Sequence, residues 1–384
     1  MDIKAANLLE LEKEKECGTL VCKSRPVIMW LETTSRCNLK CITCPRTYLP
    51  FFKGRDLDSE VFEIVKRELF PYLQLIWLHD FGEPLLAKEF EAIFDETLKN
   101  NVEVTITTNG TLLTEKWLRK FLQYGTQFAV SIDGASEETF RRIRNGAELK
   151  KITDAVNLFN KLKTTEYSSS KSNISIIFVA LKSNIAELPA LIDLAKDLKI
   201  NYIKVIHFNT SIQPPHIRKE SLYFYKQLAN KYFISAKNKA QEYGINLQVK
   251  LFEDSEKNKN KTSENQQKYR FPQKCFAPWE KIIIRANGDI APCCDSGEIM
   301  GNIKKEAFEN IWNGKKYRNF RRRINTNFPP LDCRGCVQLT GINAGIGQDS
   351  KCSEHFSQRF MYFIEHKISL IKLVYHFLKD YIVQ

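Results

Sequence analysis

Short apolar runs alternate with amphipathic stretches over the first half of the chain. The apolar runs are rich in β-branched and aromatic residues and apolar almost throughout, which is typical of strands buried on both faces. They span Val27–Thr33, Leu75–His79, Val102–Thr107, Gln127–Ile132, Ile174–Ala180 and Tyr202–His207. The stretches between them have helical spacing and span Asp58–Phe70, Lys88–Lys99, Thr114–Gln123, Glu148–Lys163 and Ala186–Leu198. Six strand–helix units in series predict an α/β fold with a parallel sheet, either open or closed into a partial barrel, with ligands at the C-terminal ends of the strands.

The second half of the chain has a different pattern. A helical linker over 216–243 and a polar loop at Asp254–Lys268 precede a second compact α+β unit. In this unit we expect a strand at Lys281–Arg285, a hairpin turn at Asn287-Gly288 and a helix near Lys305–Trp312. Helical spacing at Phe360–Val383 predicts a C-terminal amphipathic helix. The predicted organisation is an N-terminal extension (1–26), the α/β domain (27–210), a linker with a loop (211–274), the second domain (275–340) and a C-terminal tail (341–384).

Composition narrows the class of protein. With 384 residues, 43% hydrophobic and 27% charged, the chain is long enough for two domains and is neither fibrous nor wholly disordered. The net charge of +13 favours acidic partners, but the basic residues are scattered apart from one run, Arg321–Arg323, so nucleic acid is not a favoured partner. Because the N-terminus lacks the apolar core of a signal peptide, we expect a cytoplasmic protein. Packing of the C-terminal helix on its own protein is preferred over contact with a membrane surface.

Eleven cysteines provide the sharpest chemical signal. In the reducing cytoplasm, clustered cysteines indicate metal ligands or redox groups before disulfides. Cys37, Cys41 and Cys44 form a C-x3-C-x2-C motif just past the first predicted strand. Three thiolates so close together suit an iron–sulfur cluster with one iron left open to another ligand. Zinc is the alternative, but three thiolates without a nearby histidine make an incomplete tetrahedral site.

This cysteine motif after the first strand resembles the hallmark of the radical S-adenosylmethionine (radical SAM) superfamily. The resemblance implies a partial (β/α)6 barrel and a 4Fe–4S cluster on Cys37, Cys41 and Cys44, with SAM as the ligand of the open iron. An electron, delivered by a reductant such as flavodoxin or ferredoxin, would then cleave SAM to methionine and a 5′-deoxyadenosyl radical. That radical would abstract hydrogen from a substrate carbon.

Further segments at successive strand ends resemble the SAM-binding motifs of the superfamily. Residues 81–84 read Phe-Gly-Glu-Pro and look like its GGEP segment, with Phe81 replacing the first glycine. In that resemblance Glu83 binds the SAM amino group, Asn109 and Ser131 contact the ribose, and Arg144 meets the SAM carboxylate. The implied SAM-binding residues are Gly82, Glu83, Pro84, Asn109, Ser131 and Arg144.

A second set of cysteines lies in the predicted second domain. Cys275 and Cys293 flank the hairpin, and Cys333 and Cys336 form a C-x2-C pair. Spacing alone leaves zinc and 4Fe–4S as equal candidates. The sequence from Cys275 to Cys336 resembles the SPASM/twitch domain that follows many radical SAM barrels, which implies an auxiliary 4Fe–4S cluster held by Cys275, Cys293, Cys333 and Cys336. Cys294 is the alternative to Cys293, and we expect Cys17, Cys22 and Cys352 to be buried thiols.

The resemblances together predict a radical SAM enzyme, of oxidoreductase type, whose auxiliary cluster accepts an electron or orients the substrate. The substrate is a small molecule or a peptide, and the short N-terminal extension mildly favours a small molecule. A non-catalytic iron–sulfur or zinc scaffold, or a nucleic-acid binder, is the rival hypothesis. His79, Asp80 and His207 follow strands and are candidates for facing substrate, although a structural role for the histidines is equally expected.

Overall fold

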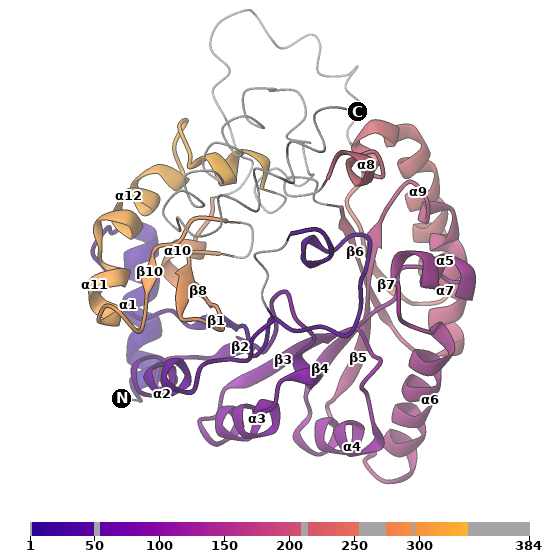
Figure 1. The fold of residues 1–384 in the computed structure, drawn as a ribbon, viewed down its shortest axis with the longest axis horizontal. Helices are drawn as coiled ribbons and strands as arrows, with labels where there is room; N and C mark the ends of the chain where they lie inside the picture. The colour runs from indigo at the N-terminus through magenta and orange to yellow at the C-terminus, as the bar shows by residue number, and fades with distance from the viewer. Residues whose placement is uncertain (1, 50–53, 209–213, 253–273, 294–295, 337–384) are drawn as a thin grey trace, which may run out of the picture.

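A computed structural model describes residues 2–49, 54–208, 214–252, 274–293 and 296–336 (Figure 1). The predicted loop at Asp254–Lys268 and the predicted C-terminal helix at Phe360–Val383 lie outside these residues.

The described strands form one ten-stranded sheet in the order β10-β9-β8-β1-β2-β3-β4-β5-β6-β7. Neighbours from β8 through β7 pair in parallel, whereas β8–β9 and β9–β10 pair antiparallel. The sheet curves around a central space in the manner of a partial barrel (Figure 1), and the six predicted strands are confirmed. The strands are β1 (Ile28–Leu31), β2 (Leu75–Trp77), β3 (Glu103–Thr108), β4 (Gln127–Ser131), β5 (Asn173–Ala180), β6 (Tyr202–His207), β7 (Asn246–Gln248), β8 (Lys281–Ile284), β9 (Asp289–Ala291) and β10 (Gly301–Asn302).

Helices cover the outer face of the curved sheet (Figure 1). The five predicted helices of the first half are confirmed as α2, α3, α4, α6 and α7. Asp58 is the N-cap of α2 and accepts a hydrogen bond from the Glu60 backbone N–H at 3.0 Å. The described α-helices are α1 (Ile3–Cys17), α2 (Ser59–Glu68), α3 (Phe90–Lys99), α4 (Glu115–Tyr124), α5 (Glu137–Ile143), α6 (Leu149–Thr165), α7 (Leu188–Asp197), α8 (Pro215–Arg218), α9 (Lys226–Glu242), α10 (Ala277–Glu280), α11 (Phe308–Trp312) and α12 (Lys315–Ile324). Short 3-10 turns are η1 (Pro45–Thr47), η2 (Pro84–Leu86), η3 (Ile185–Glu187), η4 (Leu222–Tyr225) and η6 (Leu331–Gly335).

Side chains alternate between the two faces of the strands. In β1, Met29 and Leu31 are fully buried in the hydrophobic core. The intervening Trp30 points to the opposite, inner face, where its ring meets that of Trp77 at a centroid distance of 3.6 Å. Residues that continue this inner set past the strand ends therefore face the space that the sheet encloses.

Two features of the structure change the predicted organisation. First, β8 pairs in parallel with β1, from Ile28↔Lys281 to Leu31↔Ile284, so the second unit extends the sheet of the first. Second, the N-terminal segment contains the helix α1, which the sequence pattern did not predict and which packs on α10. The residue ranges of the predicted domains stay predictions.

Candidate functional site

The first cysteine motif forms a loop that leaves the C-terminal end of β1. The backbone N–H groups of Lys40 and Ile42 donate to the carbonyls of Asn145 and Ile143, both at 3.0 Å. These two bonds join the cysteine loop to the segment after α5, so that Arg144 lies beside the central cysteine of the motif.

The segment that resembles GGEP is held against the same loop. The Glu83 backbone N–H donates to the Arg36 carbonyl at 2.8 Å. A Cβ atom at Gly82 would lie 1.9 Å from the Thr34 carbonyl oxygen, far inside van der Waals contact, so only glycine fits there. The close approach of two backbones thus brings Glu83 to the base of the cysteine loop.

The Glu83 carboxylate is buried at this point. It accepts hydrogen bonds from the Thr108 hydroxyl at 2.7 Å, the Asn109 backbone N–H at 2.7 Å and the Leu85 backbone N–H at 3.3 Å. Burial raises the pKa of Glu83 to about 7, although these hydrogen bonds act in the opposite direction. A ligand ammonium placed here would stabilise the ionised form.

Asn109 links the end of β3 to the cysteines. Its side-chain amide donates to the Asn38 side-chain oxygen at 2.9 Å and lies 3.7 Å from the Cys37 sulfur. Ser131 is buried at the end of β4, and Pro84 is the buried first residue of η2. The structure therefore brings the predicted SAM-binding residues to neighbouring strand ends, while their contacts with SAM stay predictions.

Arg144 has a partner that the sequence reasoning did not identify. Its Nε donates to the fully buried Asp133 carboxylate at 2.7 Å, and the other Asp133 oxygen accepts from the Val179 backbone N–H at 2.6 Å. The signal was present, because Asp133 belongs to the same Ser-Ile-Asp-Gly segment as Ser131. This ion pair orients the Arg144 guanidinium within the site.

The thiols of the first motif lie in a poorly solvated environment. Burial raises the pKa of Cys41 to about 11, with Arg144 opposing the shift and the neighbouring Cys44 and Cys37 adding to it. Burial also raises the pKa of Cys44. Such thiols become thiolates when a metal centre replaces their protons. Among the described residues, no three His, Cys, Asp or Glu side chains form a site for one metal ion.

Three of the second set of cysteines, Cys275, Cys333 and Cys336, lie near one another. Burial is the main cause that raises the pKa of Cys333, and the Cys275 and Cys336 thiols contribute as near neighbours. Cys275 is fixed to the end of α12, since its N–H and carbonyl bond the Asn325 side chain at 2.8 and 3.0 Å. Asp332, next to Cys333, accepts from Ser296 three residues after Cys293. Cys294, the alternative ligand, lies outside the described residues.

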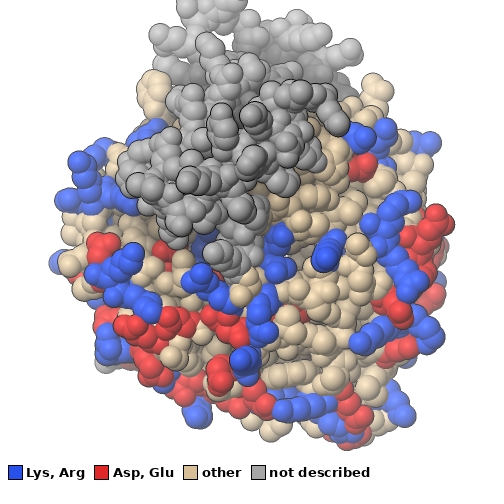
Figure 2. Space-filling model, viewed as in Figure 1, with Lys and Arg blue, Asp and Glu red and all other residues tan. Residues whose placement is uncertain are grey.

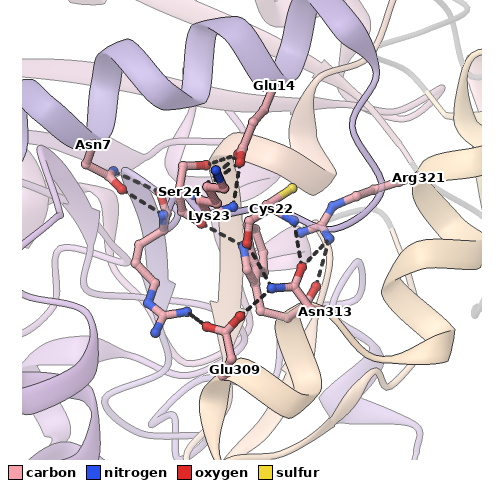
Figure 3. Close-up of polar contacts among 10 residues, drawn as sticks. Asn7, Glu14, Cys22, Lys23, Ser24, Glu309, Asn313 and Arg321 are labelled. Carbon is pink, nitrogen blue, oxygen red and sulfur yellow. Dashed lines mark hydrogen bonds and ion pairs between the residues drawn. The ribbon is translucent and has the colours of Figure 1, made fainter.

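The N-terminal segment holds this auxiliary region in place (Figure 3). The buried Glu14 carboxylate accepts from the Lys23 N–H and the Ser24 hydroxyl, both at 2.5 Å. Asn313 exchanges two hydrogen bonds of 2.8 Å with the Cys22 backbone. Buried Arg321 donates to the carbonyls of Leu20, Trp312 and Pro278 at 2.8 to 3.0 Å. The extension is therefore an integral part of the fold around the second cysteine set.

The remaining single-residue predictions have mixed outcomes. Cys22 is buried as predicted, whereas the prediction for Cys17 is wrong, because Cys17 ends α1 at the surface and is exposed. Cys352 lies outside the described residues. His207 packs on Phe233 and Phe252, and its Nε2 lies 2.9 Å from the Lys250 carbonyl, which indicates a structural role.

Charge and hydropathy add little to the site itself. Lys and Arg alternate with Asp and Glu over the face shown in Figure 2, where the basic excess forms no continuous patch outside the grey area. No helix in the described part of the chain is long and apolar enough to cross a membrane.

The curved, mainly parallel sheet therefore carries two separate sets of cysteines, one of them beside a buried carboxylate and an arginine. Comparison with protein families identifies the class of protein. Residues 31–195 match the family model of the radical SAM superfamily, and residues 275–337 match SPASM, an iron–sulfur cluster-binding domain. The chain belongs to the radical SAM superfamily and carries a C-terminal SPASM domain. Membership implies a 4Fe–4S cluster, SAM and further iron–sulfur binding in the SPASM domain.

Several known proteins are similar over most of this chain. The tungsten-containing aldehyde ferredoxin oxidoreductase cofactor-modifying protein of Pyrococcus furiosus is 24% identical over 85% of this chain and 93% of its own length. The AdoMet-dependent heme synthase of Methanosarcina barkeri is 23% identical, over 77% of this chain and 84% of its own. Among solved structures, Streptococcus suis SuiB bound to the precursor peptide SuiA has a TM-score of 0.59 at 16% identity, covering 82% of this chain and 69% of SuiB. Native anSMEcpe with bound AdoMet has a TM-score of 0.58 at 18% identity, covering 90% and 100%. At these identities the solved structures show a shared fold.

Proposed function

We propose that the protein reductively cleaves SAM and uses the resulting 5′-deoxyadenosyl radical to abstract hydrogen from a substrate carbon. The observation that carries the proposal is the convergence of three features at the C-terminal ends of the strands. These are the cysteine loop, Glu83, and Arg144 at the end of α5. The cluster and SAM, when bound, supply the electron transfer and the radical. The chain's own residues have the tasks of holding and orienting these groups.

Each residue of the site has a defined task in this proposal. Cys37, Cys41 and Cys44 hold the cluster and leave one iron open. Glu83 takes the SAM ammonium, which offsets the cost of keeping a carboxylate ionised in a buried place. Arg144, oriented by Asp133, takes the SAM carboxylate. Asn109 and Ser131 hydrogen-bond the ribose.

In the SPASM domain, Cys275, Cys293, Cys333 and Cys336 hold one auxiliary 4Fe–4S cluster that accepts an electron from the substrate radical or positions the substrate. When the cluster accepts the electron, the net reaction is a two-electron oxidation or an oxidative cross-link; when the cluster only positions the substrate, return of a hydrogen atom to the substrate radical gives an epimerisation. Support for a small-molecule substrate comes from the similar proteins that cover most of the chain, since their names describe the modification of a cofactor and the synthesis of heme. A peptide substrate is the second candidate, and an external reductant such as flavodoxin or ferredoxin supplies the electron.

Anaerobic reconstitution with iron and sulfide tests the two-cluster proposal. The unaltered chain is expected to hold about eight irons, and the Cys41→Ala and Cys333→Ala variants about four each. Cys17→Ala, an exposed thiol in neither set, is the matched control and should keep about eight irons. Equal iron in all four proteins, or stoichiometric zinc in place of iron, would contradict the proposal.

A further inference from the structure

A second group of charged side chains lies at the C-terminal ends of β8, β1 and β2. Glu32 directly follows Leu31 of β1, and Arg285 directly follows Ile284 of β8. Leu31 and Ile284 are paired in register, so Glu32 and Arg285 are neighbours across the two strands, with Cβ atoms about 5 Å apart. Asp80 follows β2, the strand on the other side of β1.

The Glu32 and Arg285 side chains face the inner side of the curved sheet, and the charges of both act on the Asp80 carboxyl. Glu32 comes two residues after Trp30, which lies on the inner face against Trp77, and strand side chains alternate with a period of two. Glu32 is 5% exposed, and its carboxylate accepts a hydrogen bond from the Ala286 backbone N–H at 2.9 Å. The cysteine loop begins five residues later, so the group lies at the same end of the barrel as the SAM-binding residues.

Arg285 has an unfilled hydrogen-bonding group. Its Nε is buried and has no acceptor among the described residues, and its guanidinium lies 5.9 Å from the centroid of the Phe81 ring. A buried charged donor without an acceptor is costly, and an anionic ligand group would satisfy it.

The neighbouring carboxyls of Glu32 and Asp80 have the opposite requirement. Burial and the neighbouring Glu32 raise the pKa of Asp80 to about 7, while Arg285 acts to lower it. Arg285, Arg46 and Arg55 act to lower the pKa of Glu32 against its burial. His79 supplies no positive charge at neutral pH, because burial lowers its pKa to about 4 and its Nδ1 accepts the Thr107 N–H. A cationic ligand group would stabilise both carboxyls in their ionised forms.

We propose that Arg285 and the Glu32–Asp80 pair form a substrate subsite for a zwitterionic, amino-acid-like group, with its carboxylate on Arg285 and its ammonium on the carboxyl pair. This inference rests on the proposed function, in which Glu83 and Arg144 already take the ammonium and carboxylate of SAM. The second set of opposite charges is therefore available to another molecule. The three side chains lie at three successive strand ends, because β1 lies between β2 and β8, whose backbones are two strand spacings, about 10 Å, apart.

Three small probes and charge-altered variants test the subsite. Binding of L-alanine, ethylammonium and propionate to the reconstituted enzyme with SAM is measured by saturation-transfer NMR, without turnover. We expect alanine to bind at least about 10-fold more tightly than either half-probe. Asp80→Asn should reduce alanine binding to the level of propionate, and Arg285→Gln to that of ethylammonium.

The control is Asp154→Asn, an exposed carboxyl on α6, which should bind alanine like the unaltered enzyme. Arg285→Met, which also removes the positive charge, replaces Arg285→Gln if that variant fails to fold. Equal binding of the three probes, no alanine binding in the millimolar range, or unchanged binding in both subsite variants overturns the proposal. If 5′-deoxyadenosine is released while these binding results fail, the subsite is wrong and the proposed function stands. If alanine binding depends on the charges as expected but SAM is not cleaved, the subsite stands and the proposed function is wrong.

Discussion

We propose that single residues at the strand ends hold SAM, and the role of Glu83 is the one that a substitution tests most directly. Its carboxylate is buried, with three hydrogen-bond donors around it. Glu83→Gln keeps the shape and removes the charge that would meet the SAM ammonium. We expect SAM to bind about 10- to 100-fold more weakly to this variant, measured by equilibrium dialysis with the reconstituted protein. Glu63→Gln, on the exposed face of α2, serves as the control, and equal SAM affinity in the two variants would contradict the role of Glu83.

The raised pKa of Asp80 predicts that the stability of the protein depends on pH. Its pKa is raised to about 7 by burial and by Glu32, so the folded protein keeps a proton that the unfolded chain loses near its ordinary value of 3.8. The contribution of the protonated Asp80 carboxyl to stability is fully present below pH 3.8, the ordinary pKa, and is lost as the pH rises through the folded-state pKa of about 7. Asp80→Asn, which cannot ionise, should therefore be more stable than the unaltered protein at pH 8 by about 1–2 kcal/mol. Anaerobic urea unfolding at pH 5 and pH 8 measures the free energy of unfolding of both proteins. If the difference between the variant and the unaltered protein is the same at the two pH values, the pKa of Asp80 is not raised.

At the scale of elements, the site depends on how closely the loop before η2 approaches the segment after β1. A methyl group at position 82 would collide with the Thr34 carbonyl, which belongs to backbone and cannot rotate away. We expect Gly82→Ala to lower the free energy of unfolding by about 2–4 kcal/mol and to displace the cysteine loop. Iron analysis should then show loss of the first cluster. Gly297→Ala is the matched control, because a Cβ there meets no atom within 4 Å, and iron retention by both variants would refute this reason for the glycine.

The contact between the N-terminal segment and α12 is a second element-scale feature. Arg321 donates to three backbone carbonyls from three segments and lies over the Trp312 ring at 4.4 Å. Arg321→Met would leave these carbonyls without their donor and should lower the free energy of unfolding by about 3 kcal/mol. Chemical unfolding of the reconstituted chain measures it. The neighbouring Arg322 is exposed, so Arg322→Met should change stability little; equal losses in the two variants would count against the network in Figure 3.

The elements with a strong local pattern could be predicted from the sequence, and those made by distant contacts could not. The strands of the barrel and the helices between them have uninterrupted apolar runs or helical spacing, and the structure confirms them. The helix α1 mixes Lys and Glu along its length, and its packing on α10 depends on residues more than 250 positions away. The pairing of Arg144 with Asp133 and the proximity of Glu32 to Arg285 arise in the same way, from strand ends that meet only in the folded chain.

At the scale of the whole molecule, one sheet connects the barrel and the first strands of the SPASM domain. Because β8 pairs with β1, the segment between Cys275 and Cys293 is joined directly to the strand that leads into Cys37. The charged group at Glu32 and Arg285 lies at this junction. Cys275 precedes β8 and Cys293 follows the antiparallel β9, so the register places these two cysteines toward the start of β8, whereas Glu32 and Arg285 lie at its end.

The central claim is that the site at the strand ends cleaves SAM, and product analysis tests it most directly. The reconstituted, dithionite-reduced protein is mixed with SAM under anaerobic conditions, and 5′-deoxyadenosine and methionine are measured. The account predicts equal amounts of the two products from the unaltered chain and from Cys17→Ala, and none from Cys41→Ala. A fully iron-loaded protein that releases no 5′-deoxyadenosine, or a Cys41→Ala variant as active as the unaltered chain, would contradict it.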